Sequence, residues 1–195
     1  MFTTVTLNPC VDRTAWISGF QYGEFNAVTK TNIDVSGKGI NVSVALAQLG
    51  VPTHCVYFNY RNDEKVVPRF LEQKAIPGTA LAVDGSLRMN VKLFDEATRV
   101  MTECNEKGFP VTEADVARAF DAIVAQIDRS TAVVLTGSVP PGVPDDFYAQ
   151  LIREVKRRGK VAILDADEAL LREGLTAWPD YVKPNRSALQ RLTGR

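Results

Sequence analysis

The amino-acid sequence predicts an α/β fold: a doubly wound, mostly parallel sheet with helices on both faces. Three observations lead to this prediction. Strand-like and helix-like segments alternate from Gly37 onward, which is typical of right-handed βαβ crossovers. The segment Thr131 to Leu135 is almost wholly apolar, as expected for a strand buried between two helix layers. With 195 residues, 45% of them hydrophobic and 24% charged, the chain can form one substantial core.

The composition excludes several classes of partner. Lys plus Arg equals Asp plus Glu at 23 each, so no overall charge attracts nucleic acid or an anionic membrane, and any anion site must be local. The three cysteines have no metal-ligand spacing, which predicts no metal site. The first residues resemble a strand and not a signal peptide, and no apolar run reaches membrane-spanning length. We therefore expect a cytoplasmic protein without nucleic-acid or membrane partners.

The chain begins with a short β-rich run from Phe2 to Leu7, which Asn8-Pro9 ends. This strand would bring Asp12 to one edge of the sheet, although an aspartate there is also typical of a turn or cap. The segments 13–20 and 27–35 alternate, are rich in threonine and are separated by Gly23. They predict a hairpin-like excursion, which would be a lid or appendage.

The segment Gly37-Lys38-Gly39 lies where an extended run gives way to a helical pattern. A glycine turn at a helix N-terminus suits an anion, and Lys38 adds a positive charge. A dinucleotide fingerprint is excluded because position 42 is valine, and a P-loop is excluded because position 39 is not Ser or Thr. A glycine turn with a solvated lysine fits the same spacing.

The middle of the chain offers a second cationic group. Residues 53–58 predict a strand, in which His54 has no catalytic partner at a useful spacing and is expected to be structural. Residues 63–74 predict a helix interrupted by Pro68. In the strand predicted over 87–94, residues 88, 90 and 92 are Arg, Asn and Lys on one face, which suits a phosphate or an ordinary solvated surface.

The remaining segments continue the alternation. Thr112 with Asp115 resembles a capping box that opens a helix. Strands are predicted over 100–104, 161–164 and 181–183, and helices over 146–158 and from Pro184-Asn185 to Arg195. In a doubly wound sheet, ligands lie beyond the carboxyl ends of the strands. Polar or glycine positions fall at those ends, namely Asp12, Gly137, Asp165 and Lys183.

Five motifs in order resemble the ribokinase-like carbohydrate kinases, in the branch of 1-phosphofructokinase and tagatose-6-phosphate kinase. They are the segments Thr6 to Asp12, Ser36 to Val42, Arg88 to Lys92, Gly137 to Gly142 and Val182 to Asn185. The resemblance covers essentially the whole chain and implies a ribokinase-like fold with a small β lid, formed by segments of about 13–36 and 86–104. It also implies that residues 1–195 are the N-terminal part of one kinase domain, without the C-terminal part of the fold.

The resemblance implies an ATP- and Mg²⁺-dependent transfer to a phosphorylated ketohexose, giving fructose 1,6-bisphosphate from fructose 1-phosphate, with tagatose 6-phosphate as the other substrate. It places Asp12, Gly37 and Asn41 on sugar hydroxyls, Lys38, Arg88 and Lys92 on the sugar phosphate, Asn105 and Ser138 near the sugar, and Lys183 and Asn185 beside the nucleotide phosphates and Mg²⁺ shell.

Three departures from the family pattern lead to an alternative. Relatives carry a later Gly-Ala-Gly-Asp motif whose aspartate is the base; the resemblance places this base beyond Arg195, so the catalytic residue is not assigned. Ala188 stands where relatives usually have a glutamate associated with Mg²⁺, and the bulky segment Asn59 to Asp63 replaces glycines beside the sugar site. The alternative is an inactive, truncated sugar-phosphate binding or regulatory module. We also expect a homodimer or other self-association, because a shortened sheet leaves an edge uncovered.

Overall fold

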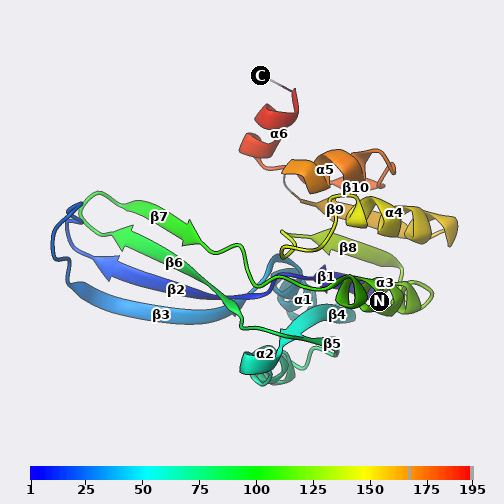
Figure 1. Ribbon diagram of the computed structural model, residues 1–195, viewed down its shortest axis with the longest axis horizontal. Helices are drawn as coiled ribbons and strands as arrows, with labels where there is room; N and C mark the ends of the chain where they lie inside the picture. Colours follow the sequence, from blue (N-terminus) through cyan, green and yellow to red (C-terminus); the bar gives the residue numbers. More distant parts are fainter. Residues whose placement is uncertain (167, 194–195) are drawn as a thin grey trace.

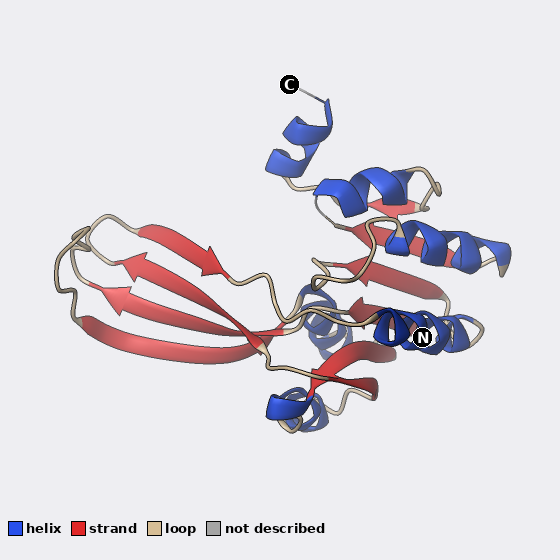
Figure 2. Cartoon of the chain, viewed as in Figure 1, coloured by secondary structure: helices blue, strands red, loops and turns tan. Residues whose placement is uncertain are grey.

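The computed structural model describes residues 1–166 and 168–193, and these fold around two separate β-sheets (Figure 1). The larger sheet lies among the helices. The smaller sheet extends from it to one side and carries no helices of its own (Figure 2). The two sheets meet where strand β1 gives way to strand β2, so the junction lies at the carboxyl end of β1.

All strand pairs of the main sheet are parallel, which confirms the doubly wound α/β fold. The strands lie in the order β10-β9-β8-β1-β4-β5. From β1 the chain first builds outward through β4 and β5 and then returns to the other side through β8. The carboxyl ends of β1 and β8 therefore flank the topological switch point, where ligands of such sheets bind. The strand bounds are Phe2–Thr6 for β1, Thr53–Tyr60 for β4, Gly78–Val83 for β5, Ala132–Thr136 for β8, Val161–Asp165 for β9 and Tyr181–Val182 for β10.

Helices cover both faces of this sheet. One face carries Val5 and Leu7 and packs against α3 (Glu113–Ile127), α4 (Phe147–Arg157) and α5 (Glu168–Leu175). The opposite face packs against α1 (Lys38–Gln48) and α2 (Val66–Gln73) around a smaller cluster that includes Ile40, Tyr57 and Leu71. Burial of these apolar faces is the main source of the fold's stability.

The last helix, α6 (Arg186–Thr193), contacts α5. It corresponds to the helix predicted from Pro184-Asn185 to Arg195. Its start agrees with that prediction to within two residues, whereas Arg195, the predicted last residue, lies outside the described residues.

The contact between α1 and β1 is made by small polar side chains. The Ser43 hydroxyl lies 2.7 Å from the Thr4 hydroxyl and 2.9 Å from that of Thr53, and all three residues are buried. These hydrogen bonds satisfy hydroxyls that would otherwise be costly to bury. At these positions α1 lies close to the sheet, and its first turn reaches the carboxyl end of β1, where a Cβ at Gly39 would lie 2.4 Å from the Val5 carbonyl oxygen.

The second sheet, which we call the lid sheet, is mixed. Its order is β3-β2-β6-β7, with β2 (Cys10–Ile17) parallel to β6 (Arg88–Asp95), and with β3 (Val28–Ser36) and β7 (Val100–Asn105) antiparallel to their neighbours. β3 is exposed over most of its length and β7 over all of it. The register pairs Asp12 with Asn90, which sets the polar face of β6 beside the start of β2 at the junction with the main sheet.

Most predicted elements are present, with three differences. The Thr112–Asp115 capping box at the start of α3 is confirmed. The predicted interruption at Pro68 is wrong: Pro68 is the third residue of α2, in the first turn, where its missing N–H has no intrahelical partner to lose. The sequence analysis missed β5 and α5. Among the described residues, no helix is both long and apolar enough to cross a membrane.

Candidate active site

A polar cavity of about 690 Å³ lies at the junction of the two sheets. The ends of β1 and β8, the first turn of α1 and the base of the lid sheet surround it. Its lining includes all eight residues that the resemblance places on the sugar side: Asp12, Gly37, Lys38, Asn41, Arg88, Lys92, Asn105 and Ser138. The structure therefore brings together residues from four elements, β2, α1, β6 and β7, and from two loops.

The glycines of the Gly37-Lys38-Gly39 segment let α1 begin against the end of β1. A Cβ at Gly39 would lie 2.4 Å from the Val5 carbonyl oxygen, and one at Gly37 would lie 2.6 Å from Cγ2 of Thr6. Gly37 also has a φ of 152°, which side-chain-bearing residues rarely adopt. The first N–H groups of α1 have no intrahelical acceptor, so this helix end faces the cavity with a partial positive charge.

Asp12 is held by three donors. Nζ of Lys92 lies 2.8 Å from Oδ2, while Nδ2 of Asn90 and Sγ of Cys10 lie 2.9 and 3.4 Å from Oδ1. Partial burial favours the protonated carboxyl, but these hydrogen bonds and the Lys92 charge outweigh it and lower the pKa of Asp12. The hydrogen bond to Asp12 in turn raises the pKa of Lys92. Asp12 is thus an ionised acceptor near neutral pH and a poor general base.

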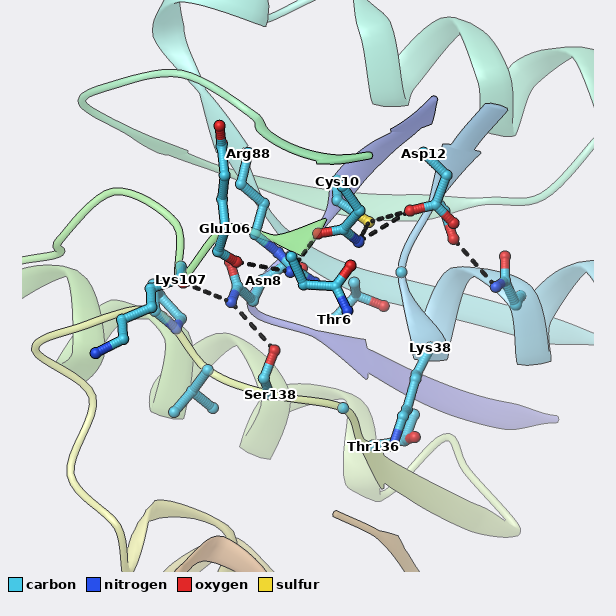
Figure 3. A pocket seen from close by; sticks show the side chains of 18 of the residues that line it. Thr6, Asn8, Cys10, Asp12, Lys38, Arg88, Glu106, Lys107, Thr136 and Ser138 are labelled. Atoms are coloured by element: carbon cyan, nitrogen blue, oxygen red, sulfur yellow. Dashed lines mark hydrogen bonds between the residues drawn. The ribbon is translucent and has the colours of Figure 1, made fainter. Parts of the chain in front are cut away.

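Cys10 is not a candidate nucleophile. Its side chain is 2% exposed, and burial raises its pKa to about 11, because the Asp12 charge adds to the effect of burial and the Arg88 charge only partly opposes it. The thiol therefore stays protonated near neutral pH. It acts as a weak hydrogen-bond donor to Asp12 (Figure 3).

Arg88 crosses the floor of the cavity. Its Nε donates to the Asn8 carbonyl at 3.2 Å, and Nη1 donates to the Glu106 carbonyl at 3.0 Å and to Oδ1 of Asn90 at 2.9 Å. The Glu106 carboxylate accepts from the backbone N–H of Met89 at 2.8 Å. These hydrogen bonds fix the guanidinium through Nε and Nη1. Among the described residues Nη2 has no hydrogen-bond acceptor, so its two N–H groups can donate to a ligand.

Asn8 ties the lid sheet to the main sheet. Its Nδ2 donates to the Lys107 carbonyl at 3.0 Å and to Oγ of Ser138 at 3.2 Å, as Figure 3 shows. The side chain is buried, and Oδ1 has no hydrogen-bond partner among the described residues. A Cβ at Gly108 would lie 2.5 Å from this oxygen, so glycine is required for the close approach. Asn8 therefore joins three loops at the rim of the cavity.

Beside the cavity, two lysines share one carboxylate. Nζ of Lys38 lies 3.7 Å from Oδ1 of Asp165, and Nζ of Lys183 lies 3.3 Å from Oδ2. Lys183 and Asn185 are not among the residues that line the cavity. Asn185 caps α6, because its Oδ1 accepts from the Ala188 N–H at 2.7 Å. Of the two positions expected on the nucleotide side, Lys183 is thus connected to the cavity-lining Lys38 through Asp165, and Asn185 caps α6.

Several expectations about other residues need correction or addition. The segment Asn59 to Asp63 does not line the cavity and so does not narrow it; Asp63 instead accepts from the Leu87 N–H at 2.9 Å and anchors the start of β6. His54 is hydrogen-bonded to Thr79 at 2.8 Å and does not line the cavity either. The sequence analysis did not assign lining residues that act through backbone groups or are largely buried, among them Thr6, Asn8, Cys10, Glu106 and Lys107.

A kinase of this kind needs a catalytic base, and none of the described residues is assigned to that role. The resemblance puts it beyond Arg195, and Arg195 itself lies outside the described residues. Asp12 has a lowered pKa, and Asp165 is paired with two lysines. Neither of these carboxylates is therefore assigned as the base.

The described residues do not themselves form a cage for a metal ion. Within 1–166 and 168–193, no three His, Cys, Asp or Glu side chains lie close enough together to hold one. Mg²⁺ in phosphoryl-transfer sites is usually held by one or two carboxylates together with substrate phosphates. The carboxylate beside the cavity, Asp165, is already engaged by two lysines, so the described side chains do not by themselves fit a metal site.

The doubly wound sheet, the mixed lid sheet and the cavity between them define a ribokinase-like fold. The model of the pfkB family of carbohydrate kinases matches residues 5–195, and the chain belongs to this family. It is 31% identical to the 1-phosphofructokinase of Vibrio cholerae over 193 residues, which is 98% of this chain and 60% of that protein. The Escherichia coli 1-phosphofructokinase gives the same identity, with 61% of its length covered. The chain therefore spans about 60% of the length of these relatives.

Solved structures agree with this assignment. A possible 1-phosphofructokinase from Thermotoga maritima superposes with a TM-score of 0.86 at 31% identity, covering 100% of this chain and 61% of that one. A tetrameric inhibited form of phosphofructokinase-2 from Escherichia coli gives a TM-score of 0.88 at 23% identity, with 64% of its chain covered. The second likeness, at this identity, concerns the fold alone.

Proposed function

We propose that this chain provides the sugar-phosphate side of an ATP- and Mg²⁺-dependent kinase that converts fructose 1-phosphate to fructose 1,6-bisphosphate. The observation that carries the proposal is one cavity in which an ionised carboxylate, Asp12, lies among the cations Lys38, Arg88 and Lys92. A carboxylate accepts hydrogen bonds from sugar hydroxyls, and the cations suit a phosphate. The names of the relatives, which are 1-phosphofructokinases, favour this substrate over tagatose 6-phosphate.

On the sugar side, the phosphate would bind between the first turn of α1, Lys38 and the Nη2 group of Arg88. Lys92 donates one of its three N–H groups to Asp12, so donors remain for a phosphate oxygen. Asp12, the Gly37 backbone and Asn41 would hold sugar hydroxyls. The side chain of Asn41 already donates to the Ser36 hydroxyl at 3.3 Å, and this contact orients it. Asn105 and Ser138 would close the rim.

On the nucleotide side, Lys183 and Asn185 would lie beside the phosphates of ATP. Phosphoryl transfer is accelerated mainly by alignment and by neutralisation of the charge that develops on the transferred group. Lys38 and Lys183 supply two such charges on either side of Asp165.

A second candidate function is sugar-phosphate binding without turnover. It is favoured by the lowered pKa of Asp12, which makes this carboxylate a weak proton acceptor. Ala188, where the family pattern has a glutamate, is buried among apolar residues. Under this reading the chain binds fructose 1-phosphate but does not transfer phosphate to it.

The deciding experiment measures ADP release by the 195-residue chain with ATP, Mg²⁺ and fructose 1-phosphate, against tagatose 6-phosphate and a sample without sugar. The same sample is titrated with fructose 1-phosphate by calorimetry. Sugar-dependent ADP release supports the kinase, and binding without release supports the binding module. A folded chain that neither binds nor turns over the sugar phosphate would refute both functions.

We also propose that the chain self-associates. β3 is a nine-residue strand at one edge of the lid sheet. Eight of its residues are exposed or only partly buried, and Ile33 is 63% exposed. Exposed edge strands tend to pair with another chain. Light scattering of the purified chain should therefore give a mass above the 21.4 kDa of one copy. A mass of one copy over a wide concentration range would contradict this proposal.

A further inference from the structure

Asn90 lies between the residue proposed to bind phosphate and the residue proposed to bind sugar hydroxyls. It is in β6, is 8% exposed and pairs with Asp12 across the lid sheet. Its amide oxygen accepts from Nη1 of Arg88 at 2.9 Å, and its amide nitrogen donates to Oδ1 of Asp12 at 2.9 Å. A further contact runs from the same nitrogen to Sγ of Cys10 at 3.2 Å.

Only an amide satisfies both neighbours. Arg88 can only donate hydrogen bonds, and the ionised Asp12 can only accept them. A side chain between them must therefore present an acceptor to one and a donor to the other. A carboxylate at position 90 would serve Arg88 but repel Asp12, and an apolar side chain would serve neither. The orientation of the amide follows from the same pattern, because the flipped form would set donor against donor and acceptor against acceptor.

We propose that Asn90 is a positioning residue that fixes Arg88 and Asp12 together, so that the cavity selects ligands carrying both a phosphate and a suitably placed hydroxyl. The inference rests on the proposed function for the identity of the ligand. Asn90 does not need to touch the ligand for this role, because it acts through the two charged side chains. Binding of fructose 1-phosphate should then depend on Asn90 more strongly than binding of inorganic phosphate or fructose alone.

Asn90→Asp tests the two halves separately. The new carboxylate keeps the shape and still accepts from Arg88, although its charge opposes a nearby anion, so affinity for inorganic phosphate should fall only by about threefold, the lower end of what one hydrogen bond contributes. At Asp12 a donor is replaced by a like charge, so affinity for fructose 1-phosphate should fall by about 10- to 100-fold, the equivalent of one lost hydrogen bond to a charged group. Asn90→Ala removes both contacts and should weaken both ligands.

The control is Asn32→Ala. Asn32 is an exposed asparagine in β3 of the same lid sheet, and its side chain contacts Asp34 and does not line the cavity. Each variant is first compared with the wild-type chain by urea unfolding. If Asn90→Ala does not fold, Asn90→Asp, which keeps the size of the side chain, carries the test alone.

The pKa of Asp12 can be measured without any ligand, so it tests the role of Asn90 independently of the proposed function. The pKa of Asp12 is followed by NMR of its carboxyl carbon, and it should rise in Asn90→Ala and further in Asn90→Asp. The other charged or titratable groups around Asp12 are unchanged in these variants: Lys92 and Arg88 on β6, the neutral thiol of Cys10 on β2, Asp34 opposite on β3 and Glu103 opposite Lys92 on β7.

The outcomes are distinguishable. A raised pKa of Asp12 with selective loss of fructose 1-phosphate binding supports the role of Asn90. An unchanged pKa of Asp12, or equal losses for inorganic phosphate and fructose 1-phosphate in Asn90→Asp, would overturn it. If the wild-type chain binds no fructose 1-phosphate, the proposed function fails, and the pKa of Asp12 in the variants still decides whether Asn90 positions that carboxylate.

Discussion

Gly39→Ala adds one methyl group to the contact between the first turn of α1 and the end of β1. Alanine is favoured over glycine in a helix by about 1 kcal/mol, so the change would stabilise an unobstructed helix. Here the new Cβ would lie 2.4 Å from the Val5 carbonyl oxygen, and that contact must open to at least 3.0 Å. The obstacle is backbone at the centre of the sheet and cannot rotate away. Overpacking of this kind costs about 1–3 kcal/mol, so after the gain in helix propensity we expect a net loss of up to about 2 kcal/mol.

The matched control is Gly174→Ala in α5. There the added Cβ would lie 2.5 Å from Cδ2 of Leu164, which is the far end of a flexible side chain, and its next-nearest contact is at 3.5 Å. Both changes carry the same gain in helix propensity, so their difference isolates the rigid contact. Urea unfolding should give a lower midpoint with an unchanged slope for Gly39→Ala and a loss below about 1 kcal/mol for Gly174→Ala. Equal losses, or none at Gly39, would refute the reasoning.

Three further predictions concern charge, pH and capping. Lys92→Met should lower the free energy of unfolding by about 1.5–3 kcal/mol, because it leaves the largely buried Asp12 without its charged donor; urea unfolding measures this. The pKa of Asp12 is lowered by folding, so its contribution is full above about pH 4 and is lost as the pH falls through the folded pKa. The stability difference between wild type and Asp12→Asn should therefore shrink in acid, and a constant difference would contradict this. Thr112→Ala should cost about 1 kcal/mol by removing the cap of α3, whereas Thr112→Ser should retain it; equal melting curves for the two would count against the capping box.

The elements found from the sequence were those with a strong local pattern. The capping box at Thr112 and the apolar strand β8 depend on neighbouring residues only. β5 was missed because it is a sheet edge whose side chains are only partly buried, so its pattern is weak. α5 was missed because eight residues give little more than two turns of periodicity. The error at Pro68 came from reading a proline inside a helix as a break without locating the helix start.

For the site, the motifs identified side chains that face the cavity but not the groups that hold them there. Asn8 and Lys107 are 99 positions apart, and Arg88 reaches the Asn8 carbonyl across 80 positions. No local pattern indicates such pairs, because their contact depends on how the lid sheet joins the main sheet. Asn90 was visible as part of a polar strand face, but its bridging role depends on its pairing with Asp12. The sequence thus indicated which charges line the cavity, and the sheet registers decide how they are oriented.

Asp165 resolves an electrostatic difficulty of such a cavity. Phosphoryl transfer needs cations around two phosphate groups at once, yet lysines held close together without a ligand repel each other. Asp165, with 17% of its side chain exposed, lies 3.7 Å from the ammonium of Lys38 and 3.3 Å from that of Lys183. One carboxylate therefore holds a lysine from α1 and a lysine from the end of β10 near the same point. An arriving phosphate competes with Asp165 for cations that are already in position, so some affinity is lost, but little ordering remains to be done on binding. Because both lysines share this partner, a charge that binds at one of them changes the field at the other, so Lys38 and Lys183 are electrostatically coupled through Asp165.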